Sequence, residues 1–600
     1  MNAPAKTVRI GGASGFWGDS SIATPQLLQV PGLQYLVYDY LAETTMAILA
    51  RARSKKPELG YATDFVTAAM LPHLQAIRQQ GVRVVSNAGG LNPKACAQAL
   101  AQAAESQGLS LHIAVVTGDD VSAQFATLRE QGLKDMYTGE VPPAQLSSAN
   151  AYTGAQGIAR ALAMGADIVI TGRCVDSAVV VGVLAHEFDW AWDDWDRLAA
   201  GTLAGHVIEC GAQATGGLFT DWQLVPDWAH MGYPVIDCAA DGSFTLGKPA
   251  GTGGLIHPGA VAEQVLYEVG DPARYQMPDV GCDFRQVSVV QAGPGQVRIA
   301  GAKGQAPTDS YKANGTYIDG YQLQVMMAIR GIDAPAKARK TADALLQRTR
   351  EQLAAKGLAD YSQTCVELLG TEALYGANAR ALPTREVILR IAARHADAKG
   401  LGFLQRECSS AGTSMGPGTR SSFAGRAEIQ PVFKVFSFLV PKQQVPLCVA
   451  LEQRQQILSP AAVIGTPTGA EPVGLPATES SSVHPEEGDW EQVPLVQLAW
   501  ARSGDKGDDE NIGVIARRPE LYPFLLTQLT AERVHQYFSH LVDGTVQRYA
   551  VPGLHAVNFV LHNALGGGGV CSLRSDPLGK SFAQMLLDLP LRVPRQLLEN

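Results

Sequence analysis

Carboxylates stand a few residues after two apolar runs of the sequence. Asp119 and Asp120 stand side by side in VVTGDDVSAQF, and Asp176 stands in ITGRCVDSAVVVG. Carboxylates placed in this way can act as general acids or bases. Two adjacent carboxylates could also hold a hard divalent ion, or one of them could simply cap the helix that follows. We take all three as candidate catalytic residues.

The segment that contains Asp176 also carries a thiol and a guanidinium group. Cys174 lies where an apolar run gives way to a predicted helix, and its neighbour Arg173 could lower the thiol pKa and so make Cys174 a nucleophile. A buried and inert cysteine is the commoner outcome at such a position. Arg173 is also a candidate clamp for the carboxylate or phosphate of a substrate.

His206 and Glu209 stand three residues apart in GHVIECGAQATGG. A histidine and a glutamate in a glycine-containing segment are typical of acid–base catalysis. The spacing also suits a metal ion on a helix, but no third ligand is evident, so we expect no metal site. A polar turn in which His206 bonds to the backbone explains the pattern equally well.

A glycine-rich segment, IGGASGFWGDS, follows the apolar run at the N-terminus. Asp39 ends the next apolar run, where the ribose of a dinucleotide would bind in a Rossmann fold. Trp17 is large for a loop that must admit a pyrophosphate, and the chain has no Tyr-x-x-x-Lys pair. We therefore expect an anionic group of another ligand here, and we do not expect NAD(P).

Two further glycine-containing segments, NAGGLNP and KPAGTGG, could present backbone N–H groups to an anion. A plain strand-to-helix turn is the alternative for the first of them. Including Asp39, the candidate substrate-binding residues of this part of the chain are Gly12, Ser14, Gly15, Gly18, Asn87, Gly89, Gly90, Arg173, Thr252, Gly253 and Gly254.

A dense polar stretch near the C-terminus, ARSGDKGDDENIGV, reads as a loop between two apolar runs. Asp505 and Lys506 could form an ion pair, and Asn511 could hold the turn. This part of the chain could bind the ligand, close over the main site or mediate dimerisation. Upstream, GTSMG matches the G-x-S-x-G pattern of hydrolases, but Pro417 follows where the helix of a nucleophile elbow should begin, so we reject that function.

The elements that must position these residues alternate between apolar runs and helical stretches over residues 1–241. Continuous apolar strands that alternate with helices predict a parallel, doubly wound α/β sheet. The predicted strands are 8–10, 35–38, 82–86, 111–116 and 168–171. Because the polar segments follow these strands, we expect them to share the carboxyl edge of one sheet.

The rest of the chain divides by composition. Residues 242–458 predict an α+β domain that completes the core, with a helix at 320–329 and a long helix at 335–354. Residues 459–491 are rich in Pro, Ser, Thr and Gly, which is typical of a flexible linker. Residues 492–600 interleave strands and helices and predict a small ferredoxin-like α/β sandwich.

Bulk properties limit the class of protein. The 600 residues carry a formal charge of -9 and no Lys/Arg run, which argues against a nucleic-acid partner. The N-terminus lacks the apolar core of a signal peptide, and we expect no membrane span. Nine cysteines without CxxC spacing predict reduced thiols, a cytoplasmic location and no zinc site. A chain of this size and class often forms homo-oligomers.

The glycine-rich and acidic segments, taken in order, resemble one family. IGGASGFWGDS, YLVYDYLAETTM, VVSNAGGLNP, VTGDD, GADIVITGRCVDSA, GHVIECGAQATGG and KPAGTGG are similar to the acyclic terpene utilisation (AtuA) family over about residues 7–455. SGDKGDDENIGV and the later GGGG segment resemble its C-terminal ferredoxin-like domain.

The resemblance implies a place in the breakdown of citronellol and geraniol, where branched acyl-CoA thioesters are carboxylated, hydrated and cleaved. We expect a carbon–carbon lyase or hydratase that acts on a 3-hydroxy-3-alkylglutaryl-CoA or a related branched acid. The CoA thioester would be the substrate, and the sequence leaves any cofactor open. Two alternatives are a nucleotide-dependent oxidoreductase that uses the first glycine-rich segment and a non-catalytic subunit of a catabolic complex.

Overall fold

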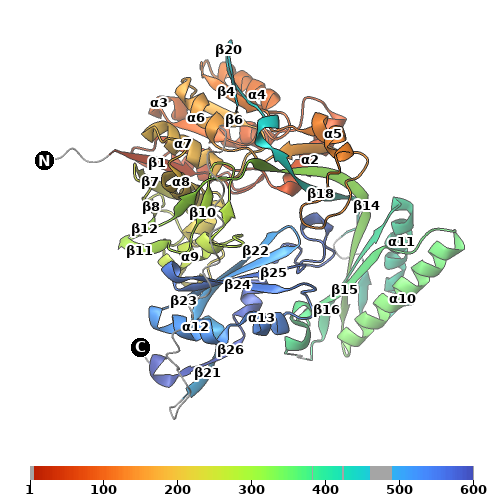
Figure 1. Ribbon diagram of the computed structural model, residues 1–600. Helices are drawn as coiled ribbons and strands as arrows, with labels where there is room; N and C mark the ends of the chain where they lie inside the picture. The colour runs from red at the N-terminus through yellow and green to blue at the C-terminus, as the bar shows by residue number, and fades with distance from the viewer. Residues whose placement is uncertain (1–5, 381–382, 422–424, 460–489, 599–600) are drawn as a thin grey trace.

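The computed structural model describes residues 6–380, 383–421, 425–459 and 490–598 (Figure 1). Of the predicted linker, residues 460–489 lie outside the described residues, while Trp490 and Glu491 belong to a strand. Among the described helices, none has the length and apolar character needed to cross a membrane.

The largest unit is an eleven-stranded sheet with a parallel centre. Its central strands run in the order β1 (Thr7–Gly12), β2 (Tyr35–Tyr38), β3 (Arg83–Ser86), β6 (Ile168–Thr171) and β4 (Ile113–Thr117), all parallel. Antiparallel strands extend this centre on both sides. Beyond β1 lie β7 (Val235–Ala239), β8 (Phe244–Gly247), β12 (Gln296–Ala300) and β11 (Ser288–Gly293). Beyond β4 lie β19 (Leu447–Leu451) and β20 (Arg454–Leu458). The predicted strands are therefore present, but the sheet is mixed rather than wholly parallel. The boundary predicted between residues 241 and 242 falls between β7 and β8, which pair with each other in this sheet.

Helices cover both faces of the parallel centre, which explains why its strands are apolar on both sides. Leu36 and Tyr38 pack with α1 (Ala23–Leu27), α2 (Glu43–Lys55), α3 (Leu74–Gln80) and α4 (Pro93–Ser106). Tyr35 and Val37 point to the other face, into the core that contains α6 (Gln156–Ala163), α7 (Ala178–Phe188), α8 (Trp195–Ile208) and α9 (Pro258–Leu266).

A long strand, β14 (Ser310–Arg330), organises a second sheet. It pairs with β5 (Ser148–Ala151), β16 (Glu386–His395), β17 (Thr419–Ser421) and β18 (Gln430–Pro441), and β15 (Gln363–Leu369) pairs with β16. The helix predicted at residues 320–329 is wrong, because this segment lies inside β14. Every second residue of this segment is apolar and buried, namely Leu323, Val325, Met327 and Ile329. This is the period of a strand and not of a helix.

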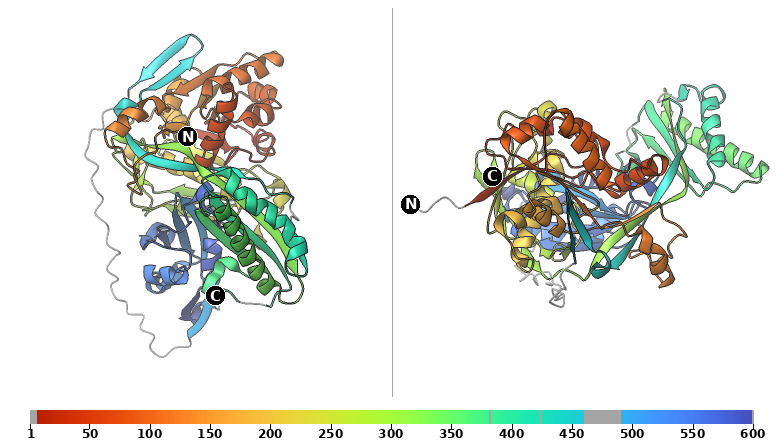
Figure 2. Two further views of the ribbon diagram at one scale, coloured as in Figure 1. Left: turned by 90° about the vertical axis from the view of Figure 1, so that its right-hand side faces the viewer. Right: turned by 90° about the horizontal axis from the view of Figure 1, so that it is seen from above.

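Two helices cover the apolar face of this second sheet. They are α10 (Ala334–Ala355), which the sequence predicted, and α11 (Ala398–Ser414). Ser414 of the GTSMG segment is the last residue of α11, so it does not occupy a strand-to-helix elbow. Figures 1 and 2 show both helices on the side of the sheet that faces away from the C-terminal domain.

The C-terminal domain contains a four-stranded antiparallel sheet in the order β22 (Ala499–Lys506), β23 (Asp509–Ala516), β25 (Ala556–Leu561) and β24 (Val546–Val551). Helices α12 (Tyr522–Gln528), α13 (Ala531–Tyr537) and α14 (Phe582–Leu586) and the pair β21 (Trp490–Pro494) and β26 (Pro590–Pro594) complete it. The polar loop predicted at 501–514 is wrong, since these residues form the β22–β23 hairpin.

Helix α9 of the main domain packs against this hairpin, which explains the buried polar residues of the hairpin. Arg502 forms an ion pair with Glu263 of α9 at 3.0 Å, and their side chains are only 4% and 0% exposed. Gly259 and Gly513 permit the close contact, because a Cβ atom on either would lie within 3.0 Å of Trp500 or Leu266. The C-terminal domain is therefore firmly docked on the main domain.

Candidate active site

The carboxyl ends of β1, β2 and β3 meet in one hydrogen-bonded group. The Ser14 hydroxyl donates to the Asp39 carbonyl at 2.9 Å, and the Asn87 amide donates to the Asp39 carboxyl at 2.5 Å. The Asn87 amide oxygen accepts from the backbone of Tyr40 at 2.8 Å. Asn87 therefore links the ends of neighbouring strands. Its side-chain amide is hydrogen-bonded within the protein, whereas the sequence suggested that it would donate to a ligand.

Asp39 is the most perturbed acid of this group. Its side chain is buried, and burial raises its pKa well above the usual range. The negative charges of Asp176 and Glu209 raise the pKa further, whereas Arg173 and the bond from Asn87 lower it. Asp39 is therefore a weaker acid than an ordinary aspartate, and two other carboxyl groups act on it.

Arg173 links Asp176 to a second polar cluster. Its guanidinium donates to the Asp176 carboxylate at 2.8 Å and lies 4.0 Å from the centre of the Tyr152 ring. The Tyr152 hydroxyl in turn donates to Glu43 at 2.5 Å. The Nε atom of Arg173 is buried and has no hydrogen-bond partner in the described structure.

Glu43 is a site residue that the sequence reasoning missed. Burial raises its pKa, but the charges of Lys312 and Arg173 outweigh burial and lower it to about 2. Asn314 also donates to Glu43, at 3.1 Å. Glu43 begins α2 just after the exit of β2, so its position was a usable signal. Lys312 and Asn314 come from β14, and only the fold brings them here.

His206 and Glu209, at the end of α8, form a contact that must hold a proton. The Nε2 atom of His206 lies 3.2 Å from the Val265 carbonyl, which can only accept, so Nε2 carries a hydrogen. The Nδ1 atom lies 3.0 Å from the Glu209 carboxyl, so a second proton must sit on one of these two atoms. Burial raises the pKa of Glu209, and the positive charge of His206 partly offsets this effect. The pair can therefore supply a proton to a neighbouring group.

The hairpin of the C-terminal domain brings Lys506 to this edge of the main sheet. Its ammonium group lies 5.9 Å from the centre of the Tyr275 ring. Although the surrounding protein would lower the pKa of Lys506, the carboxylates of Glu268, Asp176 and Glu209 raise it above its usual value. A cation from the second domain therefore faces the acids of the first.

Asp505 and Asn511 have roles that differ from those predicted. Asp505 pairs with Lys580 at 3.0 Å rather than with Lys506. The Asn511 amide oxygen accepts from the backbone of Glu268 at 2.7 Å, so Asn511 fixes the domain contact rather than a turn. These residues hold the tip of the hairpin in place.

Asp119 and Asp120 separate in the structure. Asp119 is buried and accepts from the backbone of Arg173 at 2.9 Å and from Asn150 at 2.8 Å. Burial raises the pKa of Asp119 to about 6. Asp120 is exposed and accepts from the backbone of Ser122 at 3.0 Å, but it is not the N-cap of the helix that follows, whose N-cap is Gln124. Asp119 thus supports the segment that carries Arg173.

Cys174 does not have the lowered pKa that the sequence suggested. Its side chain is 1% exposed, and burial raises the thiol pKa to about 12 despite the nearby Arg173. The commoner outcome, a buried and inert thiol, describes this residue.

The first glycine-rich segment satisfies most of its own polar groups. The Gly15 backbone donates to Asp19 at 2.9 Å, and the indole of Trp17 donates to Asp64 at 2.5 Å. A Cβ atom on Gly12 would lie 2.9 Å from the Ile208 carbonyl, and one on Gly15 would lie 2.7 Å from the backbone of Cys210. These glycines allow close packing against the end of α8. Gly18, at φ +97°, faces open space.

The other glycine-containing segments also make mainly structural contacts. Gly90 donates to the Asn87 carbonyl at 3.1 Å, and Gly89 packs against the Thr171 carbonyl. Lys248 donates to the Thr252 carbonyl at 2.6 Å, and Gly253 and Gly254 pack against residues 215–232. In the described part of the chain, no group of three or more His, Cys, Asp and Glu side chains could hold a metal ion.

Two family models match the chain. The model described as "Acyclic terpene utilisation family protein AtuA" matches residues 8–451, and the "AtuA ferredoxin-like domain" matches residues 493–592. No curated protein and no solved structure matches the chain.

Proposed function

We propose that this chain, which belongs to the acyclic terpene utilisation (AtuA) family, is a lyase or hydratase of branched acyl-CoA breakdown. The family name supports a role in the use of acyclic terpenes. The proposed substrate is a thioester of the 3-hydroxy-3-alkylglutaryl-CoA type. The polar side chains at the carboxyl edge of the main sheet would form its active site.

One observation carries this proposal: buried acids whose pKa values are raised lie beside an acid paired with a cation. Burial raises the pKa of Asp39 and of Glu209, which contacts His206, whereas Asp176 is bound to Arg173. Lys506 adds a second cation to the same group of side chains. The proposed reaction removes a proton at one atom, passes through an enolate and returns a proton at another atom. It therefore needs a base, cations that stabilise the enolate and an acid.

In the lyase direction, Asp176 would take the proton of the tertiary hydroxyl group. The carbinol carbon then becomes a carbonyl, the adjacent carbon–carbon bond breaks, and its electron pair forms an enolate. Arg173 and Lys506 would stabilise the negative charge of that enolate. Glu209, supplied by His206, would return a proton to the enolate carbon, which releases acetate and a 3-oxoacyl thioester.

In the hydratase direction the same groups would have related tasks. Asp176 would take a proton from the carbon beside a carbonyl, and Glu209 would protonate the departing hydroxyl group as water. Both reactions pass through an enolate, so the site as described is suited to either.

A product analysis tests the proposal. The full-length protein would be incubated with 3-hydroxy-3-methylglutaryl-CoA and a longer 3-alkyl homologue, and the products would be identified by mass spectrometry. Acetate with a 3-oxoacyl thioester would support a lyase, and an unsaturated thioester would support a hydratase. No conversion of any such thioester by folded protein would contradict the proposal.

A further inference from the structure

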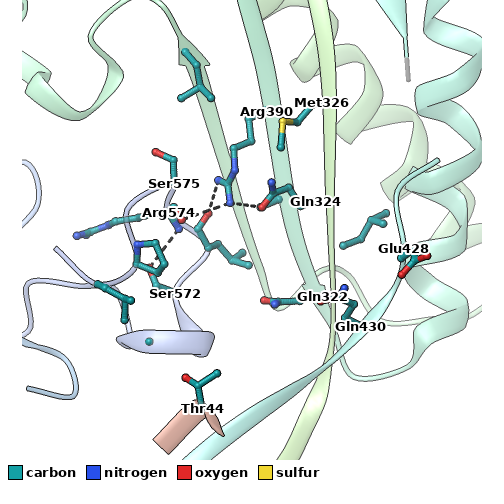
Figure 3. Close-up of a pocket in the computed structure, with 17 residues that line it drawn as sticks. Thr44, Gln322, Gln324, Met326, Arg390, Glu428, Gln430, Ser572, Arg574 and Ser575 are labelled. Carbon is teal, nitrogen blue, oxygen red and sulfur yellow. Dashed lines mark hydrogen bonds between the residues drawn. The ribbon is translucent and has the colours of Figure 1, made fainter. Parts of the chain in front are cut away.

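A cavity of about 770 Å³ lies between the second sheet and the segment 569–578 of the C-terminal domain (Figure 3). Strands β14 and β16 form one wall, and the C-terminal segment forms the other. This volume is within the range of pockets that hold small organic ligands, roughly 300–1,000 Å³. None of the candidate catalytic or substrate-binding residues named in the sequence analysis lines this cavity.

The strand period of β14 explains why this wall is polar. Leu323 and Val325 point into the core with α10 and α11, so Gln322, Gln324 and Met326 point to the cavity. Gln322 also lies opposite Gln430 of β18, which places two amide side chains next to each other. The sheet thus has one apolar face toward helices and one amide-rich face toward the second domain.

Both arginines of the wall already donate hydrogen bonds to protein groups. Arg390 is buried and donates to Glu367 at 2.5 Å and to the Gln324 amide oxygen at 2.7 Å. Arg574 donates to the Ala564 carbonyl, and Figure 3 shows its side chain turned away from Gln322 and Gln324. The wall therefore favours a ligand without charge.

The groups that remain for a ligand are hydroxyls, amides, one carboxylate and apolar side chains. Thr44, Gln322 and Gln430 can donate and accept hydrogen bonds, and the carboxylate of Glu428 can accept. The apolar lining comes from Met326, Leu369, Pro577 and Leu578.

Residues that line the cavity are neighbours in the chain of residues in or next to the candidate active site. Thr44 lines the cavity and directly follows Glu43 of the polar cluster. On the other wall, Gly569 lines the cavity, while Gly568 packs against the Gly507 carbonyl, one residue after Lys506. A substrate held at Lys506 could therefore extend into the cavity.

We propose that this cavity binds the uncharged, amide-bearing arm of the thioester substrate, a pantetheine-type chain. The inference rests on the proposed function, because that function supplies the thioester. Amide side chains are the natural partners of the amides of such an arm, and the apolar side chains would contact its alkyl part. The charged end of the substrate would lie outside the cavity.

The binding test uses pantetheine itself, measured by isothermal titration calorimetry with the full-length protein. In the variant Gln322→Leu/Gln430→Leu, the Kd should rise at least about ten-fold, since two amide partners are lost. Exposed Gln536→Leu on α13 is the matched control and should leave the Kd unchanged. An unchanged Kd in a double variant of wild-type melting temperature would overturn the assignment, as would the absence of binding to the wild type.

A kinetic test separates this inference from the proposed function. The double variant should raise KM for the CoA thioester about ten-fold and leave kcat unchanged. The N-acetylcysteamine thioester, which lacks most of the arm, should show the same KM with both proteins. Equal effects on both thioesters would overturn the cavity assignment. Pantetheine binding without turnover of any thioester would contradict the proposed function alone.

Discussion

The ammonium group of Lys506 lies 5.9 Å from the centre of the Tyr275 ring, and these two residues belong to different domains. Tyr275 also packs against His206, with 5.5 Å between ring centres. The tip of the β22–β23 hairpin therefore reaches the acid–base pair of the main domain. This contact gives the C-terminal domain a direct part in the candidate active site.

Replacement of Lys506 by methionine should lower kcat about 10²- to 10³-fold, because the enolate would lose a cation that faces it. The KM should change much less, since the charge is needed when the enolate forms. Steady-state kinetics on the thioester would measure both. Lys55→Met, at the exposed end of α2, is the matched control. Equal activity of the two variants would remove Lys506 from the mechanism.

Asp176→Asn should lower kcat about 10²- to 10⁴-fold, because the amide cannot accept the hydroxyl proton. The neighbouring strand exit offers a matched control, Asp120→Asn, since Asp120 is exposed and outside the cluster. Both variants should remain folded, but Asp176→Asn should lose some stability, because the buried Arg173 loses its charged partner. A similar activity loss in both variants would show that the effect is not specific to the proposed base.

The sequence could predict the parallel centre of the main sheet and the residues at its edge. Apolar runs that end in glycine or acid correctly indicated β2, β3 and β6, and so the neighbourhood of Asp39, Asn87 and Arg173. It could not assign their partners. Whether Asn87 bonds a ligand or Asp39 depends on the distance between two strand ends, which no local pattern contains.

Several of the errors arise from contacts between parts of the chain that are distant in sequence. Arg502 and Asn511 look like solvent-exposed loop residues, because charged residues in a strand are rarely buried. They are buried only because Glu263 and the backbone of Glu268 satisfy them from the other domain. In the same way, Lys312 reaches Glu43 only through the pairing of β14 with β5.

Cys174→Ala should keep at least about half of the wild-type activity, because a thiol with a pKa of about 12 is not a nucleophile at neutral pH. In native protein, iodoacetamide should modify half-exposed Cys448 before Cys174, as read by peptide mass spectrometry. After unfolding, both thiols should react. Early modification of Cys174 together with loss of activity would contradict this expectation.

Arg502→Met should destabilise the domain contact by roughly 3–5 kcal/mol, because it leaves the Glu263 carboxylate buried without its partner. Urea unfolding followed by tryptophan fluorescence would detect the change, since Trp500 lies at the contact with α9. Arg285→Met is the control, because its partner Asp283 is more exposed. Equal shifts of the unfolding midpoint in the two variants would argue against the importance of the buried pair.

Asp119 should make the protein less stable as the pH rises from about 4 to about 6. Its folded-state pKa is about 6, whereas its ordinary value is 3.8. Between these values the folded state keeps a proton that the unfolded state has lost, so the free energy of unfolding falls as the pH increases. The difference of about two pKa units corresponds to at most about 3 kcal/mol.

The measurement compares urea unfolding of the wild type and Asp119→Asn at pH 4, 5, 6 and 7. Other titrating groups are common to both proteins, so the difference between the two curves isolates Asp119. Asparagine does not titrate, and its effect on the bonds from Arg173 and Asn150 should be the same at every pH. The wild type should therefore lose stability relative to the variant as the pH rises, with most of the loss below pH 6. Two parallel curves would show that folding does not raise the pKa of Asp119.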